Sequence, residues 1–238
     1  MTQEHWTGVD RYLTDRLVPA DPALEAVLKS SEDAHLPPIQ VPPNLGKLLH
    51  LVVLASGART VLEIGTLAGY SAIWLARALP PGGRVVSLEA DPRHAAIAET
   101  NISRAGLSEV VEIIVGPAAE TLPKLVAQYG RYFDIVFIDA DKPSTTDYFT
   151  WSLQLTHVGS LIIVDNVVRG GKVADETSDD PAVQGMQRFF DRLASEPRVS
   201  ATAIQTVGSK GHDGFVFAMV TGDEVLSAGA ADEALVIA

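Results

Sequence analysis

Residues 61–71 have the sequence VLEIGTLAGYS, in which a strand pattern passes directly into a helical pattern. An apolar strand pattern over Thr60–Ile64 runs into Gly65 and Gly69, and a helical pattern begins at Tyr70. A short buried strand that turns tightly into a helix is the opening of a β-α-β unit. Glycines in such a turn also allow a ligand to approach the backbone closely.

The same alternation of strand and helix patterns continues along the chain, which predicts an α/β fold with a mostly parallel sheet and helices on both faces. Further strands are expected at Arg84–Glu89, Val111–Val115, Phe133–Ile138 and Ser160–Val164. Helices are expected at Tyr70–Leu79, Pro92–Ala105, Ala118–Gln128 and Ser144–His157. Two later runs, Val199–Val207 and Phe215–Val220, are separated by a glycine-rich link too short for a helix, which predicts an antiparallel pair at the sheet edge.

We interpret residues 1–238 as a single domain, because no Ser/Gly/Pro-rich linker divides them. Residues 1–58 would form N-terminal helices and a proline-rich strap at 36–43, and residues 59–220 the α/β core. Residues 221–238, rich in alanine and acids, are expected to be a frayed tail.

Composition excludes several classes of function. The formal net charge of −12 repels phosphate backbones and anionic lipid, so neither nucleic acid nor a membrane is expected as a partner. Cysteine is absent, which removes disulfides, thiolate metal sites and cysteine nucleophiles and fits a cytoplasmic location. The polar N-terminus does not resemble a signal peptide, and no apolar run approaches the ~20 residues that span a bilayer.

The ends of the first two strands predict a ligand that contains a cation and a ribose. The glycine spacing after Ile64 is not that of the dinucleotide fingerprint, and Glu63 would oppose a pyrophosphate but suit a cationic ligand. Glu89, at the end of the second strand, is placed to accept hydrogen bonds from both hydroxyls of a ribose. Asp91 before Pro92 is more simply a helix N-cap.

The ends of the fourth and fifth strands predict a metal site. Adjacent parallel strands would bring Asp139, Asp165 and Asn166 together, and three oxygen ligands suit Mg²⁺ or, less selectively, Mn²⁺ or Ca²⁺. The alternative is that these acids only cap helices or solvate loops. Acids on two neighbouring strand ends with Lys142 beside them favour the metal site.

The motifs LEIGTLAGYS, Glu89, Gly116-Pro117-Ala118, FIDADK and VDN resemble, in order and spacing, the cation-dependent O-methyltransferases, the small bacterial branch related to caffeoyl-CoA and catechol O-methyltransferases. The likeness extends from about residue 39 to residue 220. It implies a Rossmann-like class I methyltransferase fold with a seven-stranded sheet whose last strand is antiparallel, and a homodimer. The residues Leu67-Ala68 and Ser144–Thr146 depart from the family pattern, which affects the expected acceptor and not the reaction type.

The resemblance also implies roles for single residues. Lys142 corresponds to the general base, and the metal ligands would be Asp139, Asp165 and Asn166. The residues expected to hold S-adenosylmethionine are Glu63, Gly65, Ser71 and Glu89, with Val41, Ala118 and Asp139 beside them.

The predicted reaction moves a methyl group from S-adenosylmethionine to a hydroxyl of a small molecule, in particular a catechol-like vicinal diol. A phenol ionises near pH 10, so at neutral pH only about one molecule in a thousand is the reactive anion. A divalent cation would increase that fraction, and Lys142 could accept the proton when it is neutral. Alternatives are a nucleotide-dependent oxidoreductase, a non-catalytic S-adenosylmethionine-binding protein, and methylation of a non-aromatic hydroxyl.

Other residues carry weaker expectations. The strap and the loop at 167–180 would cover the site, and Arg169 is a candidate to face the substrate. His212 is a candidate of lower weight, since only its loop would approach the working edge of the sheet. Trp74 and Trp151 are expected in the core.

Overall fold

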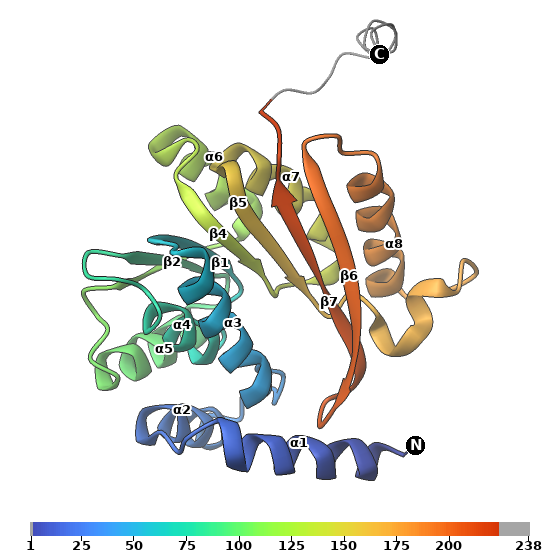
Figure 1. The fold of residues 1–238 in the computed structure, drawn as a ribbon. Helices are drawn as coiled ribbons and strands as arrows, with labels where there is room; N and C mark the ends of the chain where they lie inside the picture. The colour runs from blue at the N-terminus through green and yellow to red at the C-terminus, as the bar shows by residue number, and fades with distance from the viewer. Residues whose placement is uncertain (1, 224–238) are drawn as a thin grey trace, which may run out of the picture.

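The computed structural model of the protein describes residues 2–223, in which one twisted seven-stranded sheet organises the chain (Figure 1). The strands follow the order β3-β2-β1-β4-β5-β7-β6 across the sheet. Their bounds are β1 Thr60–Ile64, β2 Arg84–Glu89, β3 Val111–Val115, β4 Phe133–Ile138, β5 Thr156–Asp165, β6 Val199–Gly208 and β7 Gly211–Val220.

Only β7 runs against its neighbours, which confirms the predicted mostly parallel sheet with an antiparallel last strand. β1 to β5 pair in parallel, and β7 pairs antiparallel with both β5 and β6. The β6–β7 hairpin forms the expected pair at the sheet edge, but β7 begins at Gly211, four residues before the predicted start at Phe215. The ladder continues to the tip of the hairpin, where Gly208 pairs with Gly211.

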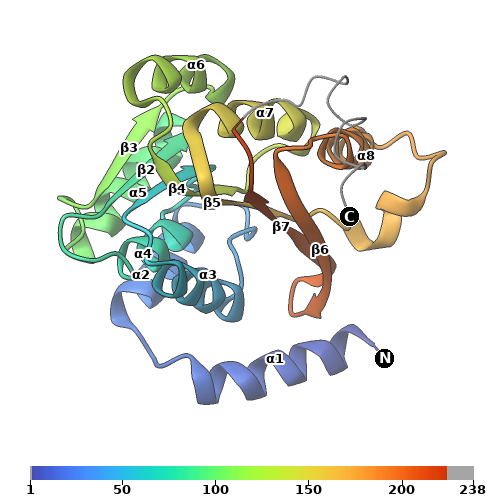
Figure 2. The ribbon, with the colours of Figure 1, turned by 45° about the horizontal axis from the view of Figure 1, so that its top comes forward.

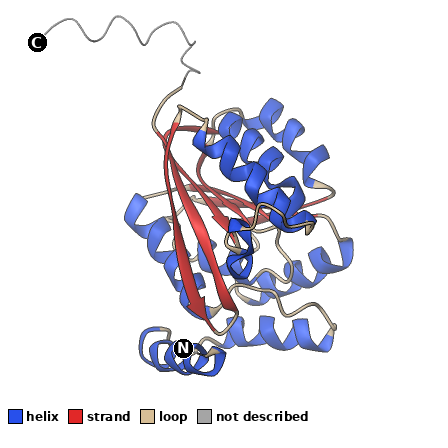
Figure 3. Ribbon diagram, turned by 90° about the vertical axis from the view of Figure 1, so that its right-hand side faces the viewer, coloured by secondary structure: helices blue, strands red, loops and turns tan. Residues whose placement is uncertain are grey.

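Helices cover both faces of the sheet, as Figures 2 and 3 show. Buried side chains alternate along the strands, so that Val61 and Ile135 face one core and Leu62 and Val136 the other. The first core includes α2 Pro22–Asp33, α3 Pro43–Ser56, α4 Tyr70–Ala76 and α5 Pro92–Arg104. The second includes α6 Ala118–Tyr129, α7 Thr145–Leu155 and α8 Pro181–Ala194.

Helix α8 is an element that the sequence analysis did not predict. Its buried residues Val183, Met186, Phe189 and Leu193 pack against the second core. Two 3₁₀ turns, η1 Lys142–Ser144 and η2 Arg169–Ala174, lie between β4 and α7 and between β5 and α8.

The N-terminal segment lies across one end of the sheet. Helix α1, Gln3–Leu17, contacts the tip of the β6–β7 hairpin, where Gln3 Nε2 donates to Gly208 O at 2.8 Å and Ser209 N donates to Asp10 at 2.6 Å. After α2 the strap is irregular, as predicted, up to the start of α3 at Pro43. Figure 1 shows α1 and α2 below the sheet.

Two sequence predictions concern other parts of the chain. The predicted tail at 221–238 lies, from residue 224 on, outside the described residues. Among the residues that are described, no helix has the length and apolar character needed to cross a membrane.

The strand order reverses at β1, and this reversal positions the site. From β1 the chain builds outward to β2 and β3, and then returns to the other side of β1 with β4 and β5. The connections after β1 and β4 therefore leave on opposite faces of the sheet, which opens a crevice at the carboxyl ends of the strands.

Candidate active site

A cavity of about 590 Å³ lies at this crevice, within the size range of small-molecule sites. Its wall is built from the ends of β1, β2, β4 and β5 and from the strap. Of the sequence-predicted site residues, eight lie on the wall: Val41, Gly65, Ser71, Glu89, Ala118, Asp139, Lys142 and Asn166. Glu63 and Asp165 are not on the wall.

Gly65 brings the ends of β1 and β4 into close contact. Its φ is +100°, and a Cβ at this position would overlap the carbonyl oxygen of Asp139. Only glycine satisfies both the left-handed backbone and this approach. The turn therefore sets Asp139 directly beside the β1–α4 connection.

Glu63 is fully buried beneath the cavity. Ser87 Oγ donates to its Oε2, whereas Oε1 has no hydrogen-bond partner among the described residues. Burial raises the pKa of Glu63 to about 7, and the nearby charges of Asp139 and Glu89 add to the rise. A buried carboxylate oxygen that lacks a donor marks a place where a cationic or hydrogen-bond-donating ligand group would be stabilised.

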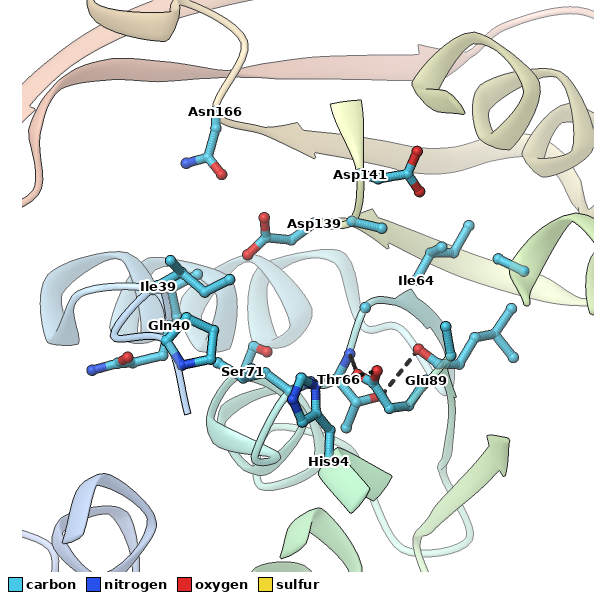
Figure 4. A pocket seen from close by; sticks show the side chains of 18 of the residues that line it. Ile39, Gln40, Ile64, Thr66, Ser71, Glu89, His94, Asp139, Asp141 and Asn166 are labelled. Carbon is cyan, nitrogen blue, oxygen red and sulfur yellow. Dashed lines mark hydrogen bonds and ion pairs between the residues drawn. The ribbon is translucent and has the colours of Figure 1, made fainter. Parts of the chain in front are cut away.

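Glu89 is held rigidly at the end of β2. Its Oε2 accepts from the backbone N–H groups of Thr66 (3.2 Å) and Leu67 (2.8 Å), and its Oε1 accepts from Asp91 N at 3.0 Å. A carboxylate offers about four acceptor sites, so this arrangement leaves capacity for a ligand hydroxyl. Figure 4 shows Glu89 beside Thr66 and His94 on one side of the cavity.

Asp139, Lys142 and Asp165 meet at the end of β4. Lys142 is 8% exposed, and its Nζ donates to Asp139 Oδ1 at 3.2 Å and to the carbonyl oxygen of Asp165 at 3.1 Å. Burial, followed by the charge of Asp139, raises the pKa of Asp165 above its usual range. Two carboxylates that repel each other in a buried place would be stabilised by a cation between them.

Asn166 completes this side of the cavity. Its backbone is left-handed, with a φ of 59°, and its N–H donates to Asp165 Oδ1 at 2.8 Å. Figure 4 shows the Asn166 amide and the Asp139 carboxylate facing the same space. Within residues 2–223, no group of three or more His, Asp or Glu side chains is arranged as a metal site. The predicted set of two carboxylates and one amide differs from such a group and is oxygen-only, as Mg²⁺ prefers.

Several wall residues were not predicted. His94 lies 3.6 Å from Glu89 Oε1, and Tyr148 donates from its hydroxyl to Asp141. Burial and this hydrogen bond raise the pKa of Tyr148. His94 lies in α5 and Tyr148 in α7, and the face that each helix turns toward the cavity depends on packing. In the sequence, they stand out only because each follows a strand-end motif by a few residues.

Of the two segments expected to cover the site, the strap contributes more to the cavity wall than the loop at 167–180. The strap contributes Pro37, Ile39, Gln40 and Val41 to the wall, whereas the loop at 167–180 contributes only Arg169. His212 is not on the wall; its ring lies near Gly171 and bonds Gln205 at 3.0 Å. Trp74 is buried and Trp151 packs against the second core, as predicted.

Comparison with known proteins agrees with this arrangement. The sequence profile described as O-methyltransferase matches residues 17–217. A catechol O-methyltransferase of Niastella koreensis is 50% identical over 220 residues, which are 92% of this chain and 100% of that protein. A catechol O-methyltransferase of Mycobacterium tuberculosis is 50% identical over 212 residues, 89% of this chain and 94% of that one.

Solved structures are similar over the same region. The O-methyltransferase from Bacillus cereus in complex with SAH has a TM-score of 0.91 and 54% identity, and covers 92% of this chain and 100% of its own. The O-methyltransferase TomG from Streptomyces achromogenes, in complex with SAM, has a TM-score of 0.90 and 47% identity, and covers 93% of this chain and 100% of its own. The chain described here therefore belongs to the O-methyltransferase family.

Proposed function

We propose that the protein transfers the methyl group of S-adenosylmethionine to one hydroxyl of a catechol-like vicinal diol, with the help of a divalent cation. One observation carries the proposal: Lys142 Nζ contacts both the Asp139 carboxylate and the Asp165 carbonyl, beside Asn166. These contacts support one shared site for the candidate base and the candidate cation ligands. The names of the two relatives at 50% identity support a catechol acceptor.

The β1 and β2 side of the cavity fits S-adenosylmethionine. The Glu89 carboxylate is fixed by three backbone N–H groups and would accept hydrogen bonds from the ribose. The unpartnered Glu63 Oε1 fits a positively charged ligand nearby, and Gly65 and Ser71 lie on the cavity wall. Val41, Ala118 and Asp139 would complete this binding surface. The SAH and SAM held by the two structural relatives support the assignment.

The β4 and β5 side fits a divalent cation. Asp139, Asp165 and Asn166 would hold it through hard oxygen atoms, with Mg²⁺ preferred over Mn²⁺ or Ca²⁺. When bound, such a cation supplies positive charge that lowers the pKa of a coordinated hydroxyl. The charge of Asp139 acts on the buried Asp165 carboxyl, which supports a cation beside the two groups.

The chain's own groups would then handle the proton and the geometry. Neutral Lys142 Nζ would accept the proton of the acceptor hydroxyl, the new O–CH₃ bond would form, and the S⁺–CH₃ bond would break to leave a neutral thioether. Asp139 and the Asp165 carbonyl hold Lys142 in place. Alignment of oxygen, carbon and sulfur by a rigid cavity contributes up to about 7 to 11 kcal/mol.

The test is to incubate the purified protein with Mg²⁺, methyl-labelled S-adenosylmethionine and a panel of acceptors. The panel contains catechols, monophenols and non-aromatic diols, and the label is followed into each product. We expect labelled product from catechols and little from monophenols, because two adjacent oxygens chelate a cation better than one. Asp139→Asn should lose activity, whereas the exposed Asp147→Asn on α7 is the matched control.

Other outcomes would support the alternatives. Cofactor binding by calorimetry without labelled product from any acceptor would indicate a non-catalytic binding protein. Oxidation of NAD(P)H with a carbonyl acceptor would indicate an oxidoreductase. Labelled product from non-aromatic diols alone would keep the reaction and change the acceptor.

A further inference from the structure

The cavity wall includes one lysine, Lys142, and one arginine, Arg169. Lys142 is paired with Asp139 at 3.2 Å. For Arg169, no carboxylate within residues 2–223 lies at ion-pair distance. Arg169 is therefore a wall cation whose charge the described protein leaves without a partner.

The backbone at Arg169 is held in an unfavourable conformation. Its φ is 56°, and three of the four non-glycine residues with positive φ, Leu67, Asn166 and Arg169, lie on the cavity wall. A left-handed conformation is unfavourable for a residue that carries a Cβ. Such strain concentrates at functional sites, where surrounding contacts enforce it.

Asp213 at the start of β7 enforces the conformation of this loop. Its Oδ1 accepts from Val168 N at 2.9 Å and from Arg169 N at 3.1 Å. Both N–H groups are therefore fixed by one carboxylate, on a strand paired with β5. The Arg169 backbone therefore has a defined position at the cavity wall.

The position of Arg169 assigns it to the acceptor end of the cavity. It follows Asn166 by three residues, beyond β5, whereas Gly65, Ser71 and Glu89, which are expected to hold S-adenosylmethionine, lie at or just beyond the ends of β1 and β2. The remaining charges on the wall are mainly acidic, namely Glu89, Asp139 and Asp141. Without Arg169, an anionic acceptor would be repelled from this wall and from a chain of net charge −12.

We propose that Arg169 binds a carboxylate on the acceptor, so that the preferred acceptors are aromatic vicinal diols that carry a carboxylate. The guanidinium presents paired N–H donors that match the two oxygens of a carboxylate. This inference rests on the proposed function, because it concerns the acceptor of the same reaction.

The test compares kcat/KM for matched acceptor pairs in which a carboxylate is replaced by the neutral primary amide. The pairs are 3,4-dihydroxybenzoate, 3,4-dihydroxyphenylacetate and 3,4-dihydroxyphenylpropionate with their amides, since the length of the spacer has to suit the cavity. We expect the wild-type protein to favour at least one acid over its amide by about 10- to 100-fold. Arg169→Gln should abolish that preference, and Arg169→Lys should retain part of it.

Two controls separate this role from others. Lys172 is exposed in the same loop, and Lys172→Gln removes one positive charge, as Arg169→Gln does. This variant should leave the acid-to-amide ratio of kcat/KM unchanged. The Kd of S-adenosylmethionine should be equal in wild type and Arg169→Gln. A tenfold weaker Kd in that variant would instead assign Arg169 to the cofactor and overturn the inference.

Failure of this inference is distinguishable from failure of the proposed function. If wild type and Arg169→Gln have equal ratios of kcat/KM for acid over amide, and both methylate neutral catechols, the role of Arg169 is overturned and methyl transfer stays intact. Absence of methylated product from every acceptor would overturn both.

Discussion

At the scale of single residues, Lys142 carries the most specific chemical claim. It is almost fully buried, yet it contacts one carboxylate and one carbonyl oxygen instead of solvent. A lysine in this place could serve only to neutralise Asp139, or it could move a proton. The two roles differ in what happens to turnover when the amine is removed and the packing is kept.

We expect Lys142→Gln to lower kcat for catechol methylation by about 10²- to 10⁴-fold, the usual contribution of a general base. The glutamine amide can still donate to the Asp165 carbonyl, so the Kd for S-adenosylmethionine and the thermal unfolding midpoint should change little. Lys124→Gln, on the exposed side of α6, is the matched control. An unchanged kcat in Lys142→Gln would reduce Lys142 to a structural ion pair.

Residues at strand ends were the part of the site that the sequence could predict. Glu89, Asp139 and Asn166 follow parallel strands, whose carboxyl ends meet by geometry, and the structure places them on one cavity wall. Glu63 lies one residue before the end of its strand, and its side chain is buried under the cavity. His94 and Tyr148 were missed because helix packing, which local sequence does not specify, decides which face of a helix meets the site.

At the scale of elements, the contact between α3 and α4 depends on one glycine. A Cβ at Gly46 would overlap the indole nitrogen of Trp74, which is buried and has no hydrogen-bond partner among the described residues. Gly46 is helical, so alanine there would gain helix propensity and lose packing. The net change in the free energy of unfolding should be a loss, because overpacking costs about 1–3 kcal/mol and the gain in helix propensity is about 1 kcal/mol or less.

We therefore expect Gly46→Ala to lower the free energy of unfolding by about 1 to 2 kcal/mol. Gly8→Ala in α1 is the matched control, because a Cβ there meets nothing within 4 Å and should be neutral or slightly stabilising. Chemical denaturation of both variants measures the difference. A stabilised Gly46→Ala would mean that Trp74 moves aside freely, and the proposed tight packing of α3 on α4 would be wrong.

The connection between α8 and β6 is fixed by a buried carboxylate. The side chain of Glu196 is 1% exposed, and it accepts from Arg192 at 2.5 Å and from Arg198 at 2.6 and 2.8 Å. The hydrogen bonds from Arg198 are the largest cause that lowers the pKa of Glu196 to about 2. A carboxyl whose pKa is lower in the folded state stabilises the fold above its unfolded pKa.

That stabilisation should be complete above about pH 4.5 and should fall as the pH drops toward 2. We expect Glu196→Gln to cost about 2 kcal/mol of unfolding free energy at pH 7 and less than half of that at pH 3. Denaturant titrations of wild type and variant at the two pH values give the comparison. A cost that does not depend on pH would show that packing, and not charge, is what Glu196 contributes.

Element prediction succeeded where apolar runs are bounded by turn residues and failed elsewhere. The strands β1 to β4 were expected at their observed bounds, because each is a nearly continuous apolar run, whereas β5 begins at Thr156, four residues before its predicted start at Ser160. Helix α8 was not predicted, although its buried residues Val183, Met186 and Phe189 recur at helical spacing. The early start of β7 at Gly211 depends on pairing with β6 and has no local signal.

At the scale of the whole molecule, the reversal of strand order at β1 brings the separate parts of the site together. Motifs up to about 100 residues apart, Glu63 to Asn166, meet because parallel strands end at the same edge of the sheet. The strap from the N-terminal segment covers this edge, and the hairpin tip supports it through the hydrogen bond from Lys210 to Pro38. A homodimer stays a prediction, which light scattering of the purified protein would test.

The role of the cation is decided by the rate of methyl transfer to catechol before and after removal of divalent metal. Metal content is followed by elemental mass spectrometry, and Mg²⁺ is then added back. We predict that the rate falls about 100-fold or more without metal, because only about one phenol in a thousand is ionised at neutral pH, and that Mg²⁺ restores it. Asp139→Asn should not be restored at the same Mg²⁺ concentration. Full wild-type activity in a sample free of divalent metal would contradict the account.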